Sequence, residues 1–330
     1  MSFYLFHNLI LFFSCNYGKK VYNNPEIILT RLIPEITTMK KTKNLGILYI
    51  MCSAFCFSCM NLFVRLSGSL PSIQKSFFRN LIAFLFALFI IKKEKVSFHI
   101  TKSSIGPLLI RSIAGTAGIL CNFYAVDHLA IADASMLNKL SPFFVLIFSY
   151  LILKENVTFY QVVCILIAFA GSLFVIKPSP ALLQNPSSLI GMLGGMAAGL
   201  AYAFVRIASK KGVKGPVIVA FFSGFSCLVT LPNLLLNYSS MTTPQVLFLL
   251  LAGLSAAGGQ FAITAAYSYA PAREISIYDY TQIIFSTLLG LIFLQELPDL
   301  YSFIGYVIII GASLVMFLRN NGYLSLKTKQ

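Results

Sequence analysis

The sequence predicts an all-α membrane protein in which ten transmembrane helices form two five-helix repeats of inverted topology. Three observations predict this fold: the composition, ten long apolar stretches, and a repeat of the chain after 141 residues. Of the 330 residues, 58% are hydrophobic and only 11% are charged. A soluble globule of this length needs more polar surface than that composition supplies. We therefore expect the chain to lie in a lipid bilayer.

Ten apolar stretches are long enough to cross a bilayer, since a spanning helix needs about 20 apolar residues at a rise of about 1.5 Å each. The connections between them are short and many contain proline or glycine, so none of them can hold a separate soluble domain. The predicted ranges are 45–66, 72–91, 104–126, 131–152, 157–176, 188–208, 216–236, 245–268, 274–295 and 300–318.

The first 38 residues differ from the rest of the chain. Their apolar run of about 13 residues is too short to span and contains His7 and Asn8, and it lacks the features of a secretory signal. Met39, which three lysines follow within four residues, is a more natural start for the membrane domain. We expect a doubtful extension at 1–38, a first repeat at 39–176, a second repeat at 188–318 and a cytoplasmic tail at 319–330.

Lysine and arginine are distributed unevenly between alternate loops: fifteen lie on the side of Met39, and essentially only Lys75 and Lys177 lie on the other. Because cytoplasmic loops carry the excess of basic residues, both termini are expected in the cytoplasm. The net charge of +15 then belongs to these loops rather than to a nucleic-acid-binding face. The predicted partners are the lipid bilayer and a small-molecule substrate, with no nucleic acid, and a homodimer is left open.

A shift of 141 residues superposes Phe63-Val64-Arg65 on Phe204-Val205-Arg206, and Glu155 on Glu296. Because each half contains five helices, an odd number, the second half must enter the membrane from the opposite side. Inverted repeats of this kind place a binding site near the bilayer midplane, between the halves. The architecture therefore indicates transport by alternating access.

The segments HLAIADASMLNKLSPFFVLIFSYLILKE and YAPAREISIYDYTQIIFSTLLGLIFLQE carry a family resemblance, although Ile283 stands in the second where Pro142 stands in the first. From Leu45 to about Leu318, the chain resembles the drug/metabolite transporter superfamily, in its ten-helix branch with two EamA repeats. More narrowly, it is similar to the S-adenosylmethionine uptake transporters of obligate intracellular bacteria. The resemblance implies a bacterial inner-membrane secondary transporter that takes up S-adenosylmethionine, and exchange for S-adenosylhomocysteine is left open. An exporter of an amino acid or another metabolite is the alternative, and the direction stays open.

Ionisable residues inside a span are functional candidates, because a charge at mid-bilayer costs about 2.5 to 3.5 kcal/mol on insertion scales. Lys139 and Asp279 lie deepest, and the repeat leaves them unmatched, because Lys139 aligns with Tyr280 and Asp279 with Asn138. Asp133 and Glu274 occupy equivalent positions at helix starts, where a carboxylate also favours the helix dipole.

The chemistry of S-adenosylmethionine suggests a role for each candidate. Its carboxylate needs a cation, its ammonium an anion, its sulfonium an aromatic face, and its adenine an amide. The candidates are Lys139 or Arg111 for the carboxylate, Asp279 or Glu274 for the ammonium, Tyr202, Tyr267, Tyr278 and Tyr280 for the sulfonium, and Asn122, Asn138 or Gln260 for the adenine.

Other patterns indicate scaffold. Arg65 and Arg206 lie at helix ends, where snorkelling to the interface is expected, and Glu155 and Glu296 recur likewise. Glycine stripes indicate close helix packing, and their members are Gly191, Gly195 and Gly199 on one helix and Gly115 and Gly118 on another.

An intramembrane enzyme is a remote alternative. His7, His99 and His128 fall outside the core spans, and no nucleophile with its base is recognisable. The phosphate-binding loop of an ATP-driven pump is also missing from the sequence. The sequence therefore predicts neither an enzyme nor any cofactor or metal site, and transport is expected to use a gradient or exchange.

Overall fold

The computed structural model describes residues 25–97, 100–129, 131–180, 185–295, 297–321 and 323, and its side chains from residue 44 onward except at positions 123, 126, 127 and 131–133. Residues 1–24, Glu296 and the side chain of Asp133 therefore lie outside the description. The helices are α2 Pro25–Leu66, α3 Ser72–Lys93, α4 Lys102–His128, α5 Ile131–Asn138, α6 Ser141–Leu151, α7 Phe159–Ile176, α8 Ser187–Lys210, α9 Gly215–Leu236, α10 Thr243–Tyr269, α11 Ala272–Ile275, the 3₁₀ helix η2 Ser276–Tyr280, α12 Thr281–Leu294 and α13 Leu300–Asn320.

Ten spans in the described residues are long and apolar enough to cross a membrane, and their ends agree with the predicted ranges within four residues. This confirms the all-α membrane fold. Residues 43–330 form one compact unit and residues 1–42 a separate one. The helix α2 begins at Pro25, and its membrane-spanning part begins at Asn44.

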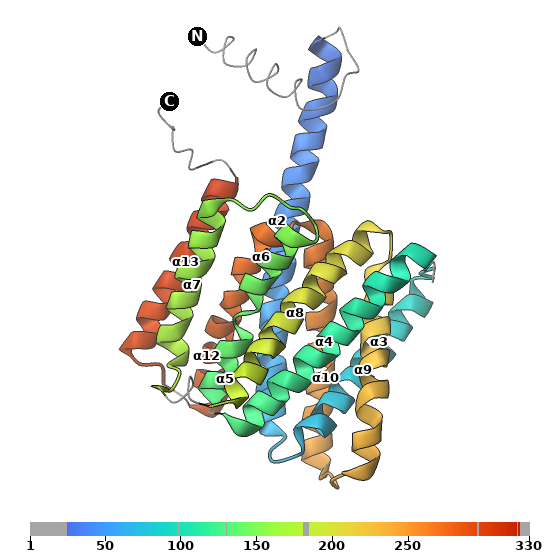
Figure 1. Cartoon of the computed structure of the whole chain (residues 1–330), viewed down its shortest axis with the longest axis vertical. Coiled ribbons are helices and arrows are strands. Elements are labelled where there is room, and N and C mark those ends of the chain that lie inside the picture. The colour runs from blue at the N-terminus through green and yellow to red at the C-terminus, as the bar shows by residue number, and fades with distance from the viewer. Residues whose placement is uncertain are drawn as a thin grey trace. The chain divides into compact units, whose positions relative to one another are not determined.

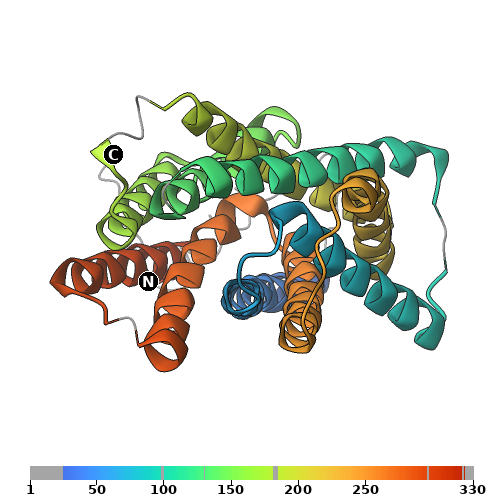
Figure 2. The same ribbon diagram turned by 90° about the horizontal axis from the view of Figure 1, so that it is seen from below.

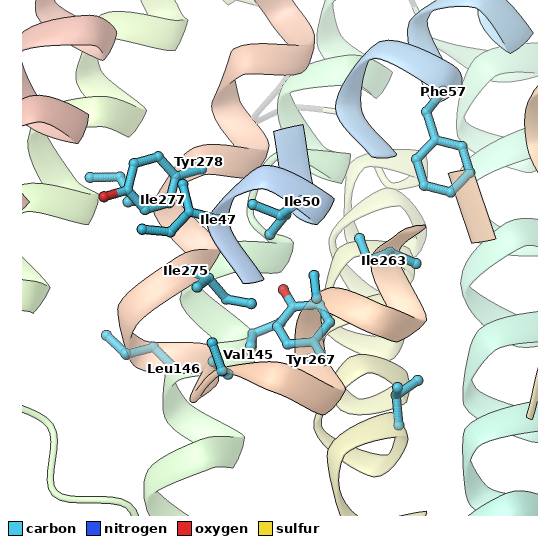
Figure 3. Packing of buried hydrophobic residues seen from close by; sticks show 14 of the residues in the cluster. Ile47, Ile50, Phe57, Val145, Leu146, Ile263, Tyr267, Ile275, Ile277 and Tyr278 are labelled. Atoms are coloured by element: carbon cyan, nitrogen blue, oxygen red, sulfur yellow. The ribbon is translucent and has the colours of Figure 1, made fainter. Parts of the chain in front are cut away.

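The helix faces that point away from the core carry large apolar side chains. On α2, Ile47, Ile50 and Phe57 are buried, whereas Leu48 and Phe55 on the other face are 56% and 47% exposed. Figure 3 shows the buried face of α2 within the hydrophobic cluster of the core. A soluble protein hides such side chains, so this arrangement suits a helix with lipid on one side and protein on the other.

The packing pairs helices that occupy equivalent places in the two halves. The helix α3 packs against α9, and α7 packs against α13, and these partners are related by the shift of 141 residues. Figures 1 and 2 show α7 and α13 side by side. The halves are thus interleaved around an approximate two-fold relation rather than placed end to end.

Close contacts confirm the expected role of the glycine stripes. A Cβ atom on Gly195 would lie 2.5 Å from the carbonyl oxygen of Leu137, and one on Gly199 would lie 2.6 Å from Cβ of Phe144. On α4, a Cβ atom on Gly118 would lie 3.2 Å from backbone atoms of α8. The absence of side chains therefore lets α8 approach α4, α5 and α6 closely.

The fourth and ninth spans are broken, although the sequence suggested continuous helices at 131–152 and 274–295. The fourth span breaks at Lys139 and Leu140, between α5 and α6. Pro142 explains this break, because it has no N–H for the carbonyl of Asn138 and its ring crowds that carbonyl. In the ninth span the 3₁₀ helix η2, which aligns with residues 135–139, interrupts the α-helix, and the Thr281 hydroxyl donates to the Tyr278 carbonyl at 2.6 Å. The structure corrects the prediction at both positions.

Candidate functional site

Lys139 lies at the break of the fourth span and reaches the break of the ninth. Its ammonium lies 3.1 Å from Oδ2 of Asp279 and donates to Oε1 of Gln282 at 2.6 Å. The side chains of Lys139 and Asp279 are only 9% and 12% exposed. The two charges that we predicted to lie deepest in the membrane therefore meet as a buried ion pair, and Gln282 completes the contacts of the ammonium.

Backbone groups at the two breaks are satisfied by the opposite half. The hydroxyl of Tyr280 donates to the carbonyl of Lys139 at 3.1 Å, and the Lys139 ammonium lies 3.4 Å from the carbonyl of Asp279. Carbonyls that a helix break leaves free cost several kcal/mol each in a membrane unless another group donates to them. Reciprocal donation across the two-fold relation makes paired breaks tolerable at this depth.

Arg111 of α4 forms a second polar group. Its Nη2 atom donates to Oε1 of Gln260 at 3.1 Å, and its guanidinium lies 4.1 Å from the ring centre of Phe222 and 5.9 Å from that of Tyr202. Gly115 leaves space for this side chain, because a Cβ atom there would lie within 2.7 Å of both Arg111 and Phe222. The guanidinium is thus held by an amide and two aromatic faces.

Tyr202 and Tyr267 link these two groups. Their rings are stacked with centres 5.3 Å apart, and the charge of Asp279 acts on both. The charge of Arg111 also acts on Tyr202. We define the substrate region as Lys139, Asp279, Gln282, Arg111, Gln260, Tyr202 and Tyr267, together with Arg79, which lies close to Tyr202 and is 8% exposed.

Arg79 was missed by the sequence reasoning, although the signal was present. It is an arginine within the predicted span 72–91, and the cost of a charge in a bilayer should have made it a candidate. Its burial, rather than its sequence neighbours, distinguishes it from a basic residue at a helix end.

Except for Tyr280, the other predicted residues make contacts outside this region. Asn138 donates from its amide nitrogen to Oδ1 of Asn122 at 2.9 Å. Glu274 lies 3.9 Å from its neighbour Arg273 on α11. In Figure 3, Tyr278 lies in the same hydrophobic cluster as Tyr267 but in a different part of it. Tyr280 contributes its hydroxyl to Lys139, and its ring is fully buried.

Arg206 corrects the expectation that it snorkels to the interface. Its Nε atom lies 2.7 Å from Oε1 of Glu155, and its Nη1 atom donates to the carbonyls of Tyr267 at 3.2 Å and Ala270 at 2.8 Å. Since α10 ends at Tyr269, these carbonyls lack helical donors and offer a better partner than lipid head groups. Arg206 therefore ties α8, the end of α10 and the loop after α6 together.

The surroundings of Glu155 favour the ionised carboxylate that pairs with Arg206. Burial raises its pKa, but hydrogen bonds from Ser149 and Arg206 and the charges of Arg206 and Lys210 outweigh burial and lower the pKa below its ordinary value of 4.5. Ser149 donates to Oε2 at 2.5 Å. The carboxylate is therefore ionised at neutral pH.

The side chains of the substrate region suit the binding of a small polar molecule. Among the described residues, no cluster of three histidine, cysteine, aspartate or glutamate side chains could hold a metal ion. Three cations, a carboxylate, two amides and stacked aromatic rings provide partners for a zwitterionic or acidic small molecule.

Comparison with known proteins gives a consistent picture. A model of the EamA-like transporter family matches residues 44–177 and 189–318. The chain is 30% identical over 283 residues to a pseudopaline exporter of Pseudomonas aeruginosa (strain UCBPP-PA14), covering 84% of this chain and 97% of the relative. It is 26% identical over 283 residues to a riboflavin transporter of Brucella anthropi, covering 82% and 97%. A solved crystal structure with 16% identity superposes with a TM-score of 0.74 over 86% of this chain and all of that one, which shows a shared fold.

Proposed function

Because the chain belongs to the EamA-like transporter family, we propose that it is a secondary transporter that moves a small polar metabolite by alternating access around the Lys139–Asp279 pair. One observation carries this proposal: equivalent spans of the two halves are both broken, and charged side chains meet across the breaks. Broken helices in corresponding positions of inverted repeats are typical of transporter binding sites.

The ion pair suggests how substrate enters. An amino-acid-like substrate brings both a carboxylate and an ammonium. When it binds, Lys139 can pair with the carboxylate and Asp279 with the ammonium, so neither charge is left unpaired. Separating the pair without such replacement costs several kcal/mol in a low-dielectric interior. The pair would then hold the two halves together until substrate binds, after which the halves can rock.

S-adenosylmethionine uptake is the specific substrate hypothesis. The family resemblance supports it, and so do the chemical partners in the substrate region. Lys139 or Arg111 would take the carboxylate, Asp279 the ammonium, and the stacked rings of Tyr202 and Tyr267 the sulfonium. S-adenosylhomocysteine would be the exchange partner.

Export of an amino acid or another metabolite is the second candidate. The 30% identity to a protein named as a pseudopaline exporter supports it. Relatives named for riboflavin and for pseudopaline also differ in substrate, so membership of the family does not determine what this chain carries.

Orientation and location belong to the same proposal. The excess of basic residues on one side supports a multi-pass protein of the bacterial inner membrane with both termini in the cytoplasm. Reporter fusions at Gln330 and in the loop that contains Lys177 test this, since only the first should report a cytoplasmic position.

Transport is tested in proteoliposomes that contain the purified full chain. Vesicles loaded with unlabelled S-adenosylmethionine or S-adenosylhomocysteine should accumulate radiolabelled S-adenosylmethionine well above empty vesicles. Absence of exchange with these compounds would sink the specific hypothesis, while exchange with another amino-acid derivative would support the exporter. No transport of any small metabolite would contradict the proposed function itself.

A further inference from the structure

Two arginine side chains are buried in the substrate region without an acidic partner among the described residues. Arg79 of α3 is 8% exposed and Arg111 of α4 is 2% exposed. The Nε atom of each has no hydrogen-bond partner, and neither guanidinium pairs with a carboxylate in the part of the chain that the structure describes. Arginine is always charged at neutral pH, so these groups cannot escape the cost by losing a proton.

Arg79 and Arg111 lie on neighbouring helices, because α3 and α4 pack against each other and both pack against α9. The charge of Arg79 acts unfavourably on Arg111, and the charges of both act on Tyr202. Gln260 and Phe222 contact Arg111, but an amide and an aromatic face only partly replace the solvation of a cation.

A scaffold role does not explain the pair. The shift of 141 residues aligns Arg79 with Ala220 and Arg111 with Ala252, and both alanines are buried. The second half therefore packs at these positions without any charge. The arginines are a feature of the first half alone, as expected for one end of an asymmetric site.

The charge balance points in the same direction. Asp279 already neutralises Lys139, so the two arginines leave the substrate region with two uncompensated positive charges among the described residues. A planar guanidinium recognises a carboxylate or a phosphate through paired hydrogen bonds. An acidic ligand between Arg79 and Arg111 would supply the missing partner.

We propose that Arg79 and Arg111 form one anion site, and that the transported metabolite is an amino-acid derivative with net negative charge that carries a second acidic group there. This inference rests on the proposed function and names its substrate class. The acidic group is a carboxylate or a phosphate. The anion site therefore favours the second candidate, another amino-acid derivative, over S-adenosylmethionine, because the two positive groups and single carboxylate of S-adenosylmethionine make it a poor ligand for two arginines.

Ligand binding to the purified full chain tests the proposal through the rise in unfolding temperature with ligand concentration. The probes share an amino-acid end and differ in charge: methionine, S-adenosylmethionine, glutamate and O-phosphoserine. Glutamate or O-phosphoserine should bind at least tenfold more tightly than methionine and S-adenosylmethionine. The stronger of the two acidic probes identifies the acidic group, and equal affinity for all four would overturn the proposal.

Variants of Arg79 test whether this residue produces the preference for acidic probes. Arg79→Gln should reduce the preference for the acidic probe to less than threefold while methionine binding persists, and Arg79→Lys should keep an intermediate preference. Lys93→Gln, at the exposed end of the same helix, is the matched control and should bind like the wild type. If Arg79→Gln does not fold, the comparison of Arg79→Lys with the wild type decides, since an unchanged preference in that variant would count against a paired guanidinium site.

The outcome is separable from the test of transport. A charge preference without transport in proteoliposomes would support the anion site and contradict the transporter. Transport with no charge preference would support the transporter and contradict the anion site.

Discussion

Tyr280 donates a hydrogen bond to the carbonyl of Lys139 at 3.1 Å, and these two residues occupy the same position in the two repeats. Residues related by an approximate two-fold axis contact each other only where they lie close to that axis. The Lys139–Asp279 pair therefore lies at the centre of the pseudo-symmetric frame, although the pair itself is asymmetric. The two related repeats thus hold, at their centre, a site whose positive group comes from the first repeat and whose negative group comes from the second.

Removing one member of the central pair should destabilise the protein. Lys139→Met or Asp279→Asn leaves an uncompensated buried group, which typically costs about 3 to 5 kcal/mol, whereas the double variant removes both charges and should recover much of the stability. Transport should be lost in all three variants. Unfolding temperature in detergent and substrate exchange in proteoliposomes measure these effects.

The exposed Lys177–Asp299 pair provides the control for that experiment. Both side chains are nearly half exposed, so Lys177→Met should change the unfolding temperature little. Full exchange activity in Lys139→Met or Asp279→Asn would refute the central role of the pair.

Tyr280→Phe should weaken the junction between the two breaks. The change removes one hydroxyl and leaves the buried Lys139 carbonyl without that donor, which costs about 1 to 3 kcal/mol. Tyr301→Phe removes the same hydroxyl from a residue that is 59% exposed, so this control variant should change the unfolding temperature little. Equal unfolding temperatures for the two variants would contradict this reading of the hydrogen bond.

Gly115→Ala should displace Arg111 without removing any polar group. A Cβ atom at this position meets Arg111 at 2.2 Å and Phe222 at 2.7 Å, so the guanidinium must shift. Misplacing a binding group by about 1 Å can cost about a hundredfold, and we expect KM for exchange to rise about tenfold or more.

Gly106→Ala on the same helix is its control, because a Cβ atom there meets nothing within 4 Å. If both alanine variants show the wild-type KM, the glycine is not needed to position Arg111.

Arg206→Gln should loosen the tie between α8, the end of α10 and the loop that contains Glu155. The pair is mostly buried, so its loss should cost more than the ~1 kcal/mol of an exposed pair and less than the ~5 kcal/mol of a fully buried one. Arg206→Lys keeps the charge but not the forked contacts and should be intermediate.

The same tie should depend on pH. Because the folded-state pKa of Glu155 lies below its ordinary value of 4.5, its contribution to stability is present above that value and is lost as pH falls through the folded-state pKa. The difference in unfolding temperature between wild type and Arg206→Gln should be largest near neutral pH and shrink in acid. A difference that does not change with pH would argue that Glu155 is not the partner that matters.

The sequence by itself determined the ten spans, their pairing into two repeats and the candidacy of Lys139 and Asp279, because these depend on apolar length, internal alignment and the cost of charge in a bilayer. Pro142 could also have indicated the break of the fourth span, but nothing comparable marks η2 in the ninth.

Only the tertiary structure decided which charges meet. Lys139 and Asp279 are 140 residues apart, and their contact depends on how two broken spans cross. The same packing pairs Arg206 with Glu155 and leaves Arg79 and Arg111 without an acidic partner among the described residues. The physical reason is that a side chain's partner depends on its neighbours in space, and local sequence determines depth in the membrane far better than it determines those neighbours.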